Sequence, residues 1–233
     1  MTDSQNVKLD TSIECVLFDL DGTLIDTAPD FTLVVNQLLA EHDREALSHE
    51  AIHLNVSNGA RALVSNAFGI EEGQDGFADL LERLLELYYQ QLTITKARLY
   101  PGLDDLLQQL EEQNIPWGIV TNKPEKYSVR LLEQLRLDTR CSVLVCPDHV
   151  RETKPHPEPI LLALEKLGLS SEKAVYLGDH IRDIQAAKNA DVIAIAAAYG
   201  YLADDAKAEE WYADFILQSS EQTTSLLNLL KFA

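Results

Sequence analysis

Positive charge is scarce in this chain of 233 residues, in which 19 lysines and arginines face 38 aspartates and glutamates for a formal net charge of −19. Binding to nucleic acid depends on a basic surface that releases counterions, so no nucleic-acid partner is expected. Anionic membrane surfaces are disfavoured for the same reason. A small anionic substrate is still compatible with this composition, provided that its pocket has local positive charge.

Cysteines and long apolar runs are also few. The chain has only Cys15, Cys141 and Cys146 and no Cys-x-x-Cys pair, which argues against a disulfide framework and a structural zinc site and predicts reduced thiols. No apolar run approaches the roughly 20 residues that span a bilayer. The polar stretch from Met1 to Ser12 lacks the apolar segment of a signal peptide. These absences predict a soluble cytoplasmic protein with no membrane partner, either a monomer or a homodimer.

Five short apolar runs predict buried strands. They are Cys15 to Phe18, Trp117 to Val120, Val143 to Val145, Ala174 to Leu177 and Val192 to Ile195. Because these runs do not alternate apolar with polar residues, they are typical of a parallel sheet that is covered on both faces. Amphipathic stretches with leucine or isoleucine stripes, such as residues 103–110 and 160–167, lie between the runs. The alternation predicts an α/β fold with a doubly wound, Rossmann-like parallel sheet.

One long segment interrupts this alternation. Residues 27–96 show helical periodicity, for example at Phe31, Val34 and Leu38, and no clear strand. An insert of this length is too long for a connection within a compact domain. We therefore predict a small all-helical cap domain of residues 27–96, inserted after the first strand of a core made of residues 1–26 and 97–233.

Polar residues follow four of the predicted strands. They are Asp19 and Asp21; Thr121, Asn122 and Lys123; Lys154; and Asp179 and Asp183. Because ligands bind at the carboxyl ends of parallel strands, these side chains should converge. Each one alone has an ordinary structural explanation, such as a turn, a helix cap or a solvated surface charge. Together they predict a carboxylate cluster with two lysines and a threonine hydroxyl.

Such a cluster has a definite chemistry. Crowded carboxylates raise one another's pKa values, and Mg²⁺ relieves this repulsion while also binding phosphate oxygens. A nearby lysine suits the charge of a phosphoryl group. An aspartate can attack phosphorus and form an aspartyl-phosphate. Asp19 and Asp21 are two residues apart, so in an extended chain one could attack while the other handles the proton.

The strand ends carry four motifs. They are Phe18-Asp19-Leu20-Asp21-Gly22-Thr23-Leu24, Val120-Thr121-Asn122-Lys123, Lys154-Pro155 and Gly178-Asp179-His180-Ile181-Arg182-Asp183. In order and spacing the chain resembles the haloacid dehalogenase superfamily in its phosphatase branch, from about Ile13 to the C-terminal region. The resemblance implies a hydrolase whose helical cap closes over the site, excludes water and reads the substrate.

The resemblance also implies roles for the carboxylates. Asp19 would be the nucleophile and a Mg²⁺ ligand. Asp21 would protonate the leaving alcohol, later activate water, and ligate Mg²⁺ through its backbone carbonyl. Asp179 would be the third protein ligand, and Asp183 would support it or reach the metal through water. The second aspartate favours phosphoryl transfer over dehalogenation, because a halide leaving group needs no acid.

The remaining core positions would contact the substrate. Thr121 would donate to the phosphoryl oxygens, Asn122 would assist through its backbone or amide, and Lys154 would neutralise developing charge. Lys123 would add local positive charge to the site. His180 stands where a small hydroxyl residue is more usual in this family, and it could touch substrate or cap a helix. Asp191 stands where glycine is usual, in a position that favours a left-handed backbone.

The cap should determine which phosphomonoester is hydrolysed. A turn at Asn58-Gly59 would aim Arg61 at the site, where it could pair with a substrate carboxylate; an exposed helical arginine is the alternative. The core sequence resembles the group that acts on N-acetylmuramic acid 6-phosphate in peptidoglycan recycling, with phosphoglycolate as the alternative substrate. A sugar phosphomutase and a non-catalytic module of the same fold stay open as further alternatives.

Overall fold

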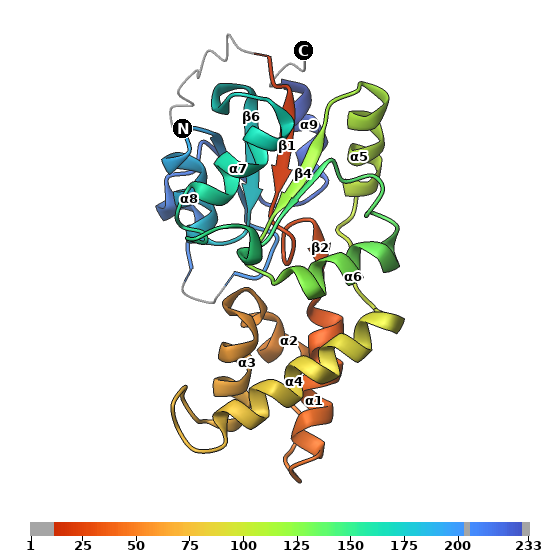
Figure 1. Cartoon of the computed structure of the whole chain (residues 1–233), viewed down its shortest axis with the longest axis vertical. Helices are drawn as coiled ribbons and strands as arrows, with labels where there is room; N and C mark the ends of the chain where they lie inside the picture. The colour runs from red at the N-terminus through yellow and green to blue at the C-terminus, as the bar shows by residue number, and fades with distance from the viewer. Residues whose placement is uncertain (1–11, 203–205, 230–233) are drawn as a thin grey trace.

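The computed structural model describes residues 12–202 and 206–229 (Figure 1). A parallel sheet with the strand order β5-β4-β1-β6-β7-β8 forms the centre of the core. Its strands are β1 (Cys15–Phe18), β4 (Trp117–Val120), β5 (Val143–Val145), β6 (Ala174–Gly178), β7 (Ile193–Ala197) and β8 (Phe215–Leu217). The five predicted strands are confirmed, although β6 ends one residue later than predicted and β7 begins one residue and ends two residues later. The edge strand β8 was not predicted, although its three residues also form a short apolar run.

Helices cover both faces of the sheet. They are α5 (Leu103–Glu112), α6 (Glu125–Leu135) and α9 (Gln222–Leu229) on one face, and α7 (Glu158–Leu167) and α8 (Ile181–Asn189) on the other. Alternate residues of β1 enter the two cores: Val16 and Phe18 pack with α5 and α6, whereas Leu17 packs with α7 and α8. The doubly wound fold is therefore confirmed. The predicted stripe on α7 is wrong at Leu161, which is 44% exposed.

Four helices follow the first strand and its loop. They are α1 (Ala28–Ala40), α2 (His49–His53), α3 (Gly59–Phe68) and α4 (Phe77–Gln91). They lie beyond the carboxyl ends of β1 and β4 (Figure 1). Phe31 of α1 stacks on Tyr88 of α4, with ring centroids 4.2 Å apart. We call residues 27–96 the cap; its division from the core as a domain stays a prediction.

The chain enters and leaves the cap through a short antiparallel ribbon. Its strands β2 (Ile25–Asp26) and β3 (Arg98–Leu99) are too short to have been visible as an apolar pattern. The Tyr201 hydroxyl accepts hydrogen bonds from the backbone N–H groups of Thr27 and Ala28, at 2.5 and 2.8 Å. The Tyr201 side chain of the core thus satisfies backbone N–H groups at the start of α1, the first helix of the cap.

The structure also bears on the predicted thiols and on the expected lack of membrane-spanning helices. Cys15, Cys141 and Cys146 are free, and burial raises the pKa of the Cys15 thiol to about 12. Among the residues that the structure describes, no helix has the length and apolarity to cross a bilayer. The expected lack of a signal peptide concerns residues 1–12, nearly all of which lie outside the described residues. The sequence also predicts a short closing helix over residues 224–230, of which Leu230 lies outside them.

Candidate active site

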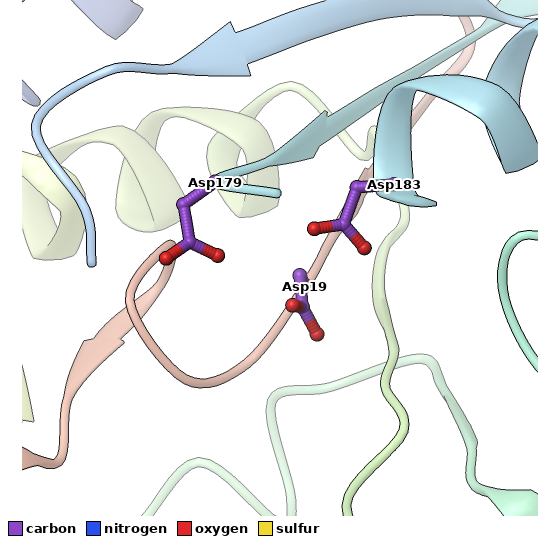
Figure 2. Close-up of side chains that lie close together, drawn as sticks. All are labelled: Asp19, Asp179 and Asp183. Carbon is purple, nitrogen blue, oxygen red and sulfur yellow. The ribbon is translucent and has the colours of Figure 1, made fainter. Parts of the chain in front are cut away.

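The strand order reverses between β1 and β6, where the chain winds outward in both directions, and open sheets bind ligands at such a point. Asp19 follows β1, Asp179 follows β6, and Asp183 lies in the first turn of α8. Figure 2 shows their carboxylates converging on one point. All three are buried, and each offers an oxygen within 4.8 Å of the others. The predicted convergence of these strand ends is therefore present.

Lys154 lies among these carboxylates and is only 3% exposed. Its Nζ is 2.9 Å from Asp19 Oδ1 and 2.7 Å from Asp183 Oδ1. It also donates to the Tyr176 hydroxyl at 2.8 Å and to the backbone carbonyl of Val120 at 3.0 Å. Burial opposes the charge of Lys154, but Asp183 and Asp19 raise its pKa above the ordinary value. The ammonium is therefore held in place and charged.

The cluster keeps an excess of negative charge, because three carboxylates face one ammonium. Burial, followed by repulsion from Asp183 and Asp21 that Lys154 partly offsets, raises the pKa of Asp19 to about 6. Burial and the nearby Asp19 and Asp183 raise the pKa of Asp179 to about 8. A hard divalent cation that prefers carboxylate oxygens would relieve this repulsion. The donor set therefore fits Mg²⁺.

The hydrogen bonds indicate which oxygens face such an ion. Asp183 uses Oδ1 for Lys154 and Oδ2 for the backbone N–H of His180, at 3.0 Å. Asp179 Oδ2 accepts from the Ser57 hydroxyl at 2.9 Å and from the Tyr201 N–H at 2.8 Å. Asp179 Oδ1 has one weaker contact, the Thr23 hydroxyl at 3.4 Å. This arrangement supports a direct ligand role for Asp179 and a supporting role for Asp183.

Two glycines allow the loops to close around Asp179. Gly22 has a φ of +80°, and a Cβ there would overlap the Asp179 carboxylate. A Cβ on Gly200 would overlap the Gly22 carbonyl and the Asp179 side chain. Neither loop therefore has room for a side chain at the point where it contacts the Asp179 carboxylate.

Asp21 points away from the cluster toward the cap. Its carboxylate accepts from the Lys123 ammonium at 2.8 and 3.1 Å and from the Thr27 hydroxyl at 2.5 Å. Lys123 in turn lies over the rings of Phe31 and Tyr88, at 5.2 and 4.6 Å. Lys123 was expected to add local positive charge at the substrate; it does line the cavity, and the structure also gives it an ion pair with Asp21.

Thr121 and Asn122 take different positions. Thr121 is buried and lines the cavity beside Asp19, as a phosphoryl ligand should. The Asn122 amide holds the loop of Lys154: Oδ1 accepts from the Lys154 N–H at 3.2 Å and Nδ2 donates to its carbonyl at 3.1 Å. The side-chain amide of Asn122 therefore positions Lys154, and the backbone of Asn122 is the part that could contact substrate.

The two cap residues selected from the sequence lie at the rim. Asn58 is exposed, and the Arg61 side chain is 64% exposed with its Nε 3.0 Å from Glu72 Oε1. Both border the cavity. The expectation that the turn aims Arg61 inward is not met here, because the first turn of α3 directs it to Glu72 on the cap surface.

The two unusual positions are explained locally. His180 caps α8: its Nδ1 accepts from the Arg182 N–H at 3.2 Å, while Asp183 accepts from the His180 N–H. Burial, and the nearby Arg182, lower the pKa of His180 to about 4, so the ring is a neutral acceptor. Asp191 has the left-handed φ of 55° that was expected of it.

Several residues of the site were not selected from the sequence. Ser57 lies in the 3-10 turn Val56–Asn58, and its carbonyl accepts from Arg182 Nη2 while its hydroxyl reaches Asp179. Tyr201 joins Asp179 to the start of α1. These residues are polar side chains without a local pattern, and only the packing of the cap against the core brings them to the site.

The cap and core enclose a cavity of about 360 Å³. Its floor includes Asp19, Asp21 and Thr121. Apolar and aromatic side chains form much of its wall: Phe31, Val56, Leu81, Leu85, Tyr88 and Tyr127. A cavity of this size and lining lies in the range that holds small-molecule ligands, which is about 300–1,000 Å³.

Residues 16–197 match the family described as haloacid dehalogenase-like hydrolase. The chain belongs to this family. The motif resemblance is thereby confirmed, and this hydrolase has its four motifs at the carboxyl edge of the sheet.

The relatives of this hydrolase carry two different names. An N-acetylmuramic acid 6-phosphate phosphatase from Pseudomonas putida is 38% identical over 205 residues, which are 88% of this chain and 92% of the relative. A phosphoglycolate phosphatase from Xanthomonas campestris pv. campestris is 40% identical over 207 residues, 89% and 93% of the two chains. A solved structure described as a predicted phosphoglycolate phosphatase from Haemophilus somnus has a TM-score of 0.81 at 27% identity, over 93% of this chain and 99% of that one.

Proposed function

We propose that this hydrolase is a Mg²⁺-dependent phosphomonoesterase that works through an aspartyl-phosphate on Asp19. The observation that carries the proposal is the environment of the Asp19 carboxylate. It lies at the floor of the cavity between cap and core, 2.9 Å from a buried lysine and within the carboxylate cluster that fits a divalent cation. Family membership and the phosphatase names of the relatives support the same reaction class.

In this proposal, hydrolysis proceeds in two steps, with Asp19 as the nucleophile and Asp21 as the acid and base. In the first, an Asp19 oxygen forms a bond to phosphorus as the ester oxygen leaves, and Asp21 gives its proton to that alkoxide. In the second, Asp21 takes a proton from water as the water oxygen attacks phosphorus and the bond to Asp19 breaks. Lys154 and Thr121 bind the phosphoryl oxygens. A bound Mg²⁺ would neutralise their charge, held by Asp19, Asp179 and the Asp21 carbonyl.

The ion pair between Lys123 and Asp21 has a role in this scheme. Asp21 must give up a proton in the first step and take one up in the second. The Lys123 ammonium lies 2.8 Å from the Asp21 carboxylate and over two aromatic rings, so it holds that carboxylate in position for both proton transfers. We expect Asp21→Asn to lower kcat by about 10² to 10⁴, the usual contribution of a positioned acid or base.

We propose N-acetylmuramic acid 6-phosphate as the substrate. The size and lining of the cavity support this choice, because a ligand as small as phosphoglycolate would leave most of about 360 Å³ to water. The sugar ring would occupy the space between the cap wall and Tyr127. The relatives from two Pseudomonas species that are named for this substrate match the chain at 36–38% identity.

Phosphoglycolate is the second candidate, because a relative with that name is 40% identical. Phosphate release with both substrates, at matched concentration and with Mg²⁺, separates them. A preference of about a hundredfold in kcat/KM, which corresponds to roughly 2.7 kcal/mol, assigns the substrate. If the enzyme hydrolyses an aryl phosphate but neither of these substrates, the proposed phosphomonoesterase reaction stands and both proposed substrates are rejected.

A phosphomutase would use the same two aspartates, and a bisphosphate product without inorganic phosphate would identify one. The intact set of Asp19, Lys154 and Asp179 argues against a non-catalytic module. The cytoplasmic location and the choice between monomer and homodimer stay predictions.

A further inference from the structure

Three cations border the cavity, and two of them already have a carboxylate partner. Lys123 pairs with Asp21 at 2.8 Å, and Arg61 pairs with Glu72 at 3.0 Å. The third, Arg182, makes no ion pair within residues 12–202 and 206–229, and its buried Nε has no hydrogen-bond partner there. Arg182 is therefore the positive charge of the cavity wall that is free to meet an anion.

The structure fixes Arg182 at both ends. Its backbone belongs to the first turn of α8, where its N–H donates to His180 Nδ1 at 3.2 Å. Its Nη2 donates to the carbonyl of Ser57 in the cap. The guanidinium thus spans the junction of core and cap on the side of Asp179, to which the Ser57 hydroxyl also donates. A group held in this way can orient a ligand.

The chemistry of a guanidinium indicates the ligand. A guanidinium at the cavity wall that has no carboxylate partner among the described residues can form charge-assisted hydrogen bonds with a substrate that supplies an anionic acceptor. The planar fork of arginine matches a carboxylate in two parallel hydrogen bonds. The phosphoryl group belongs at Asp19, Lys154 and Thr121, so the anion at Arg182 must be a second one on the same molecule.

We propose that Arg182 binds the carboxylate of the substrate and so selects phosphomonoesters that carry a second anionic group. This inference rests on the proposed function, since both candidate substrates have such a carboxylate. The proposed carboxylate site is therefore Arg182, a core residue of the motif that also supplies Asp179 and Asp183. Arg61, the site expected from the sequence, is exposed and paired.

The test compares two sugar phosphates that differ by the carboxylate. N-acetylglucosamine 6-phosphate lacks the lactyl group of N-acetylmuramic acid 6-phosphate and is otherwise the same. We expect Arg182→Gln to lower kcat/KM for the muramic acid ester by about 10- to 100-fold, the effect of a charged hydrogen bond. For the glucosamine ester the change should be under about threefold. Arg182→Lys keeps the charge but loses the fork and should restore part of the difference.

Two further variants complete the design. Lys188→Gln removes a charge from the same helix, where Lys188 pairs with Asp214, and should leave the preference intact. Arg61→Gln tests the rival position. Equal losses on both esters in Arg182→Gln would show that Arg182 only positions the cap and would overturn the proposal. Loss of the preference in Arg61→Gln alone would overturn it as well.

The wild-type enzyme separates failure of this inference from failure of the proposed function. If it hydrolyses both sugar phosphates equally and leaves phosphoglycolate untouched, the proposed substrate class is wrong, and the inference falls with it. If it prefers the muramic acid ester and Arg182→Gln keeps that preference, the proposed function stands and the role of Arg182 alone is rejected.

Discussion

The sheet edge and the cap border the same cavity, but they hold their charged groups in opposite ways. At the sheet edge Asp19, Asp183 and Lys154 are buried and bonded to one another. In the cap, Asn58 is exposed and the Arg61 side chain is 64% exposed. Groups that stabilise a transition state act best when they are fixed and shielded from water. The fixed charges that act on the phosphoryl group and the exposed charges at the rim therefore lie on different parts of the chain.

The largest effect should come from the nucleophile. Asp19→Asn should lower phosphate release by about 10⁴ to 10⁶, the loss found when a residue that acts as part of a catalytic unit is removed. Because asparagine has the same shape and relieves repulsion in the cluster, the melting temperature should not fall. The measurement is release of phosphate from an aryl phosphate, beside a thermal melt. Near-normal activity would reject the aspartyl-phosphate mechanism.

The buried lysine provides the strongest test of stability. Lys154→Met leaves Asp19 and Asp183 buried without a cation, and the loss of a partner from a buried ion pair costs about 3–5 kcal/mol. Urea unfolding measures the change. The control is Lys126→Met, on the exposed surface of α6, where the lysine lies over the Tyr89 ring and its loss should cost at most about 1 kcal/mol. Similar losses in both variants would contradict the contrast between buried and exposed charges.

The cluster should also make stability depend on pH. In the absence of metal, burial and mutual repulsion raise the pKa of Asp19 to about 6 and of Asp179 to about 8, from an ordinary value of 3.8. The unfolded chain releases these protons first, so the metal-free protein should lose stability as the pH rises from about 4 to 8. Melting temperatures in a chelating buffer measure this slope, and Asp179→Asn should make it shallower.

Added Mg²⁺ should reverse the trend, because it binds the ionised carboxylates. The increase in melting temperature on adding Mg²⁺ should therefore be larger at pH 8 than at pH 5. An equal increase at both values would mean that the cluster of Asp19 and Asp179 is not the metal site.

The smallest effect concerns the contact between the two regions. Ser57→Ala removes the hydrogen bond from the cap to Asp179 Oδ2, so the carboxylate is oriented less firmly. A typical net hydrogen bond corresponds to about 0.5–1.5 kcal/mol, so the Mg²⁺ concentration for half-maximal activity should rise about 2- to 12-fold. Ser65→Ala, which removes a contact with Glu71 elsewhere on the cap, is the matched control. The contact has no role in metal binding if the two variants behave alike.

The core chemistry could be predicted from sequence for a physical reason. Parallel strands bring their carboxyl ends to one edge, so Asp19, Lys154 and Asp179 converge although they are far apart along the chain. The predicted strands had continuous apolar runs, and β8 has a run of the same length as β5 that was not predicted as a strand, whereas the two-residue strands β2 and β3 left no such pattern.

The cap could be predicted only as a helical segment. The direction of Arg61 depends on a partner, Glu72, that lies 11 residues away along the chain. The contacts of Ser57 and Arg182 depend on how the cap rests on the core. No local periodicity encodes either arrangement, because both arise from tertiary packing.

The ribbon of β2 and β3 has a consequence for how such enzymes diversify. Ile25 lies opposite Leu99, and Asp26 lies opposite Arg98. Paired residues of antiparallel strands are about 5 Å apart, so a tight turn would be enough to join the chain at this point. The sheet therefore does not depend on what is inserted there. Over evolutionary time the intervening helices can be lengthened, altered or exchanged, and new substrates acquired, while the machinery that breaks the phosphate ester is inherited unchanged.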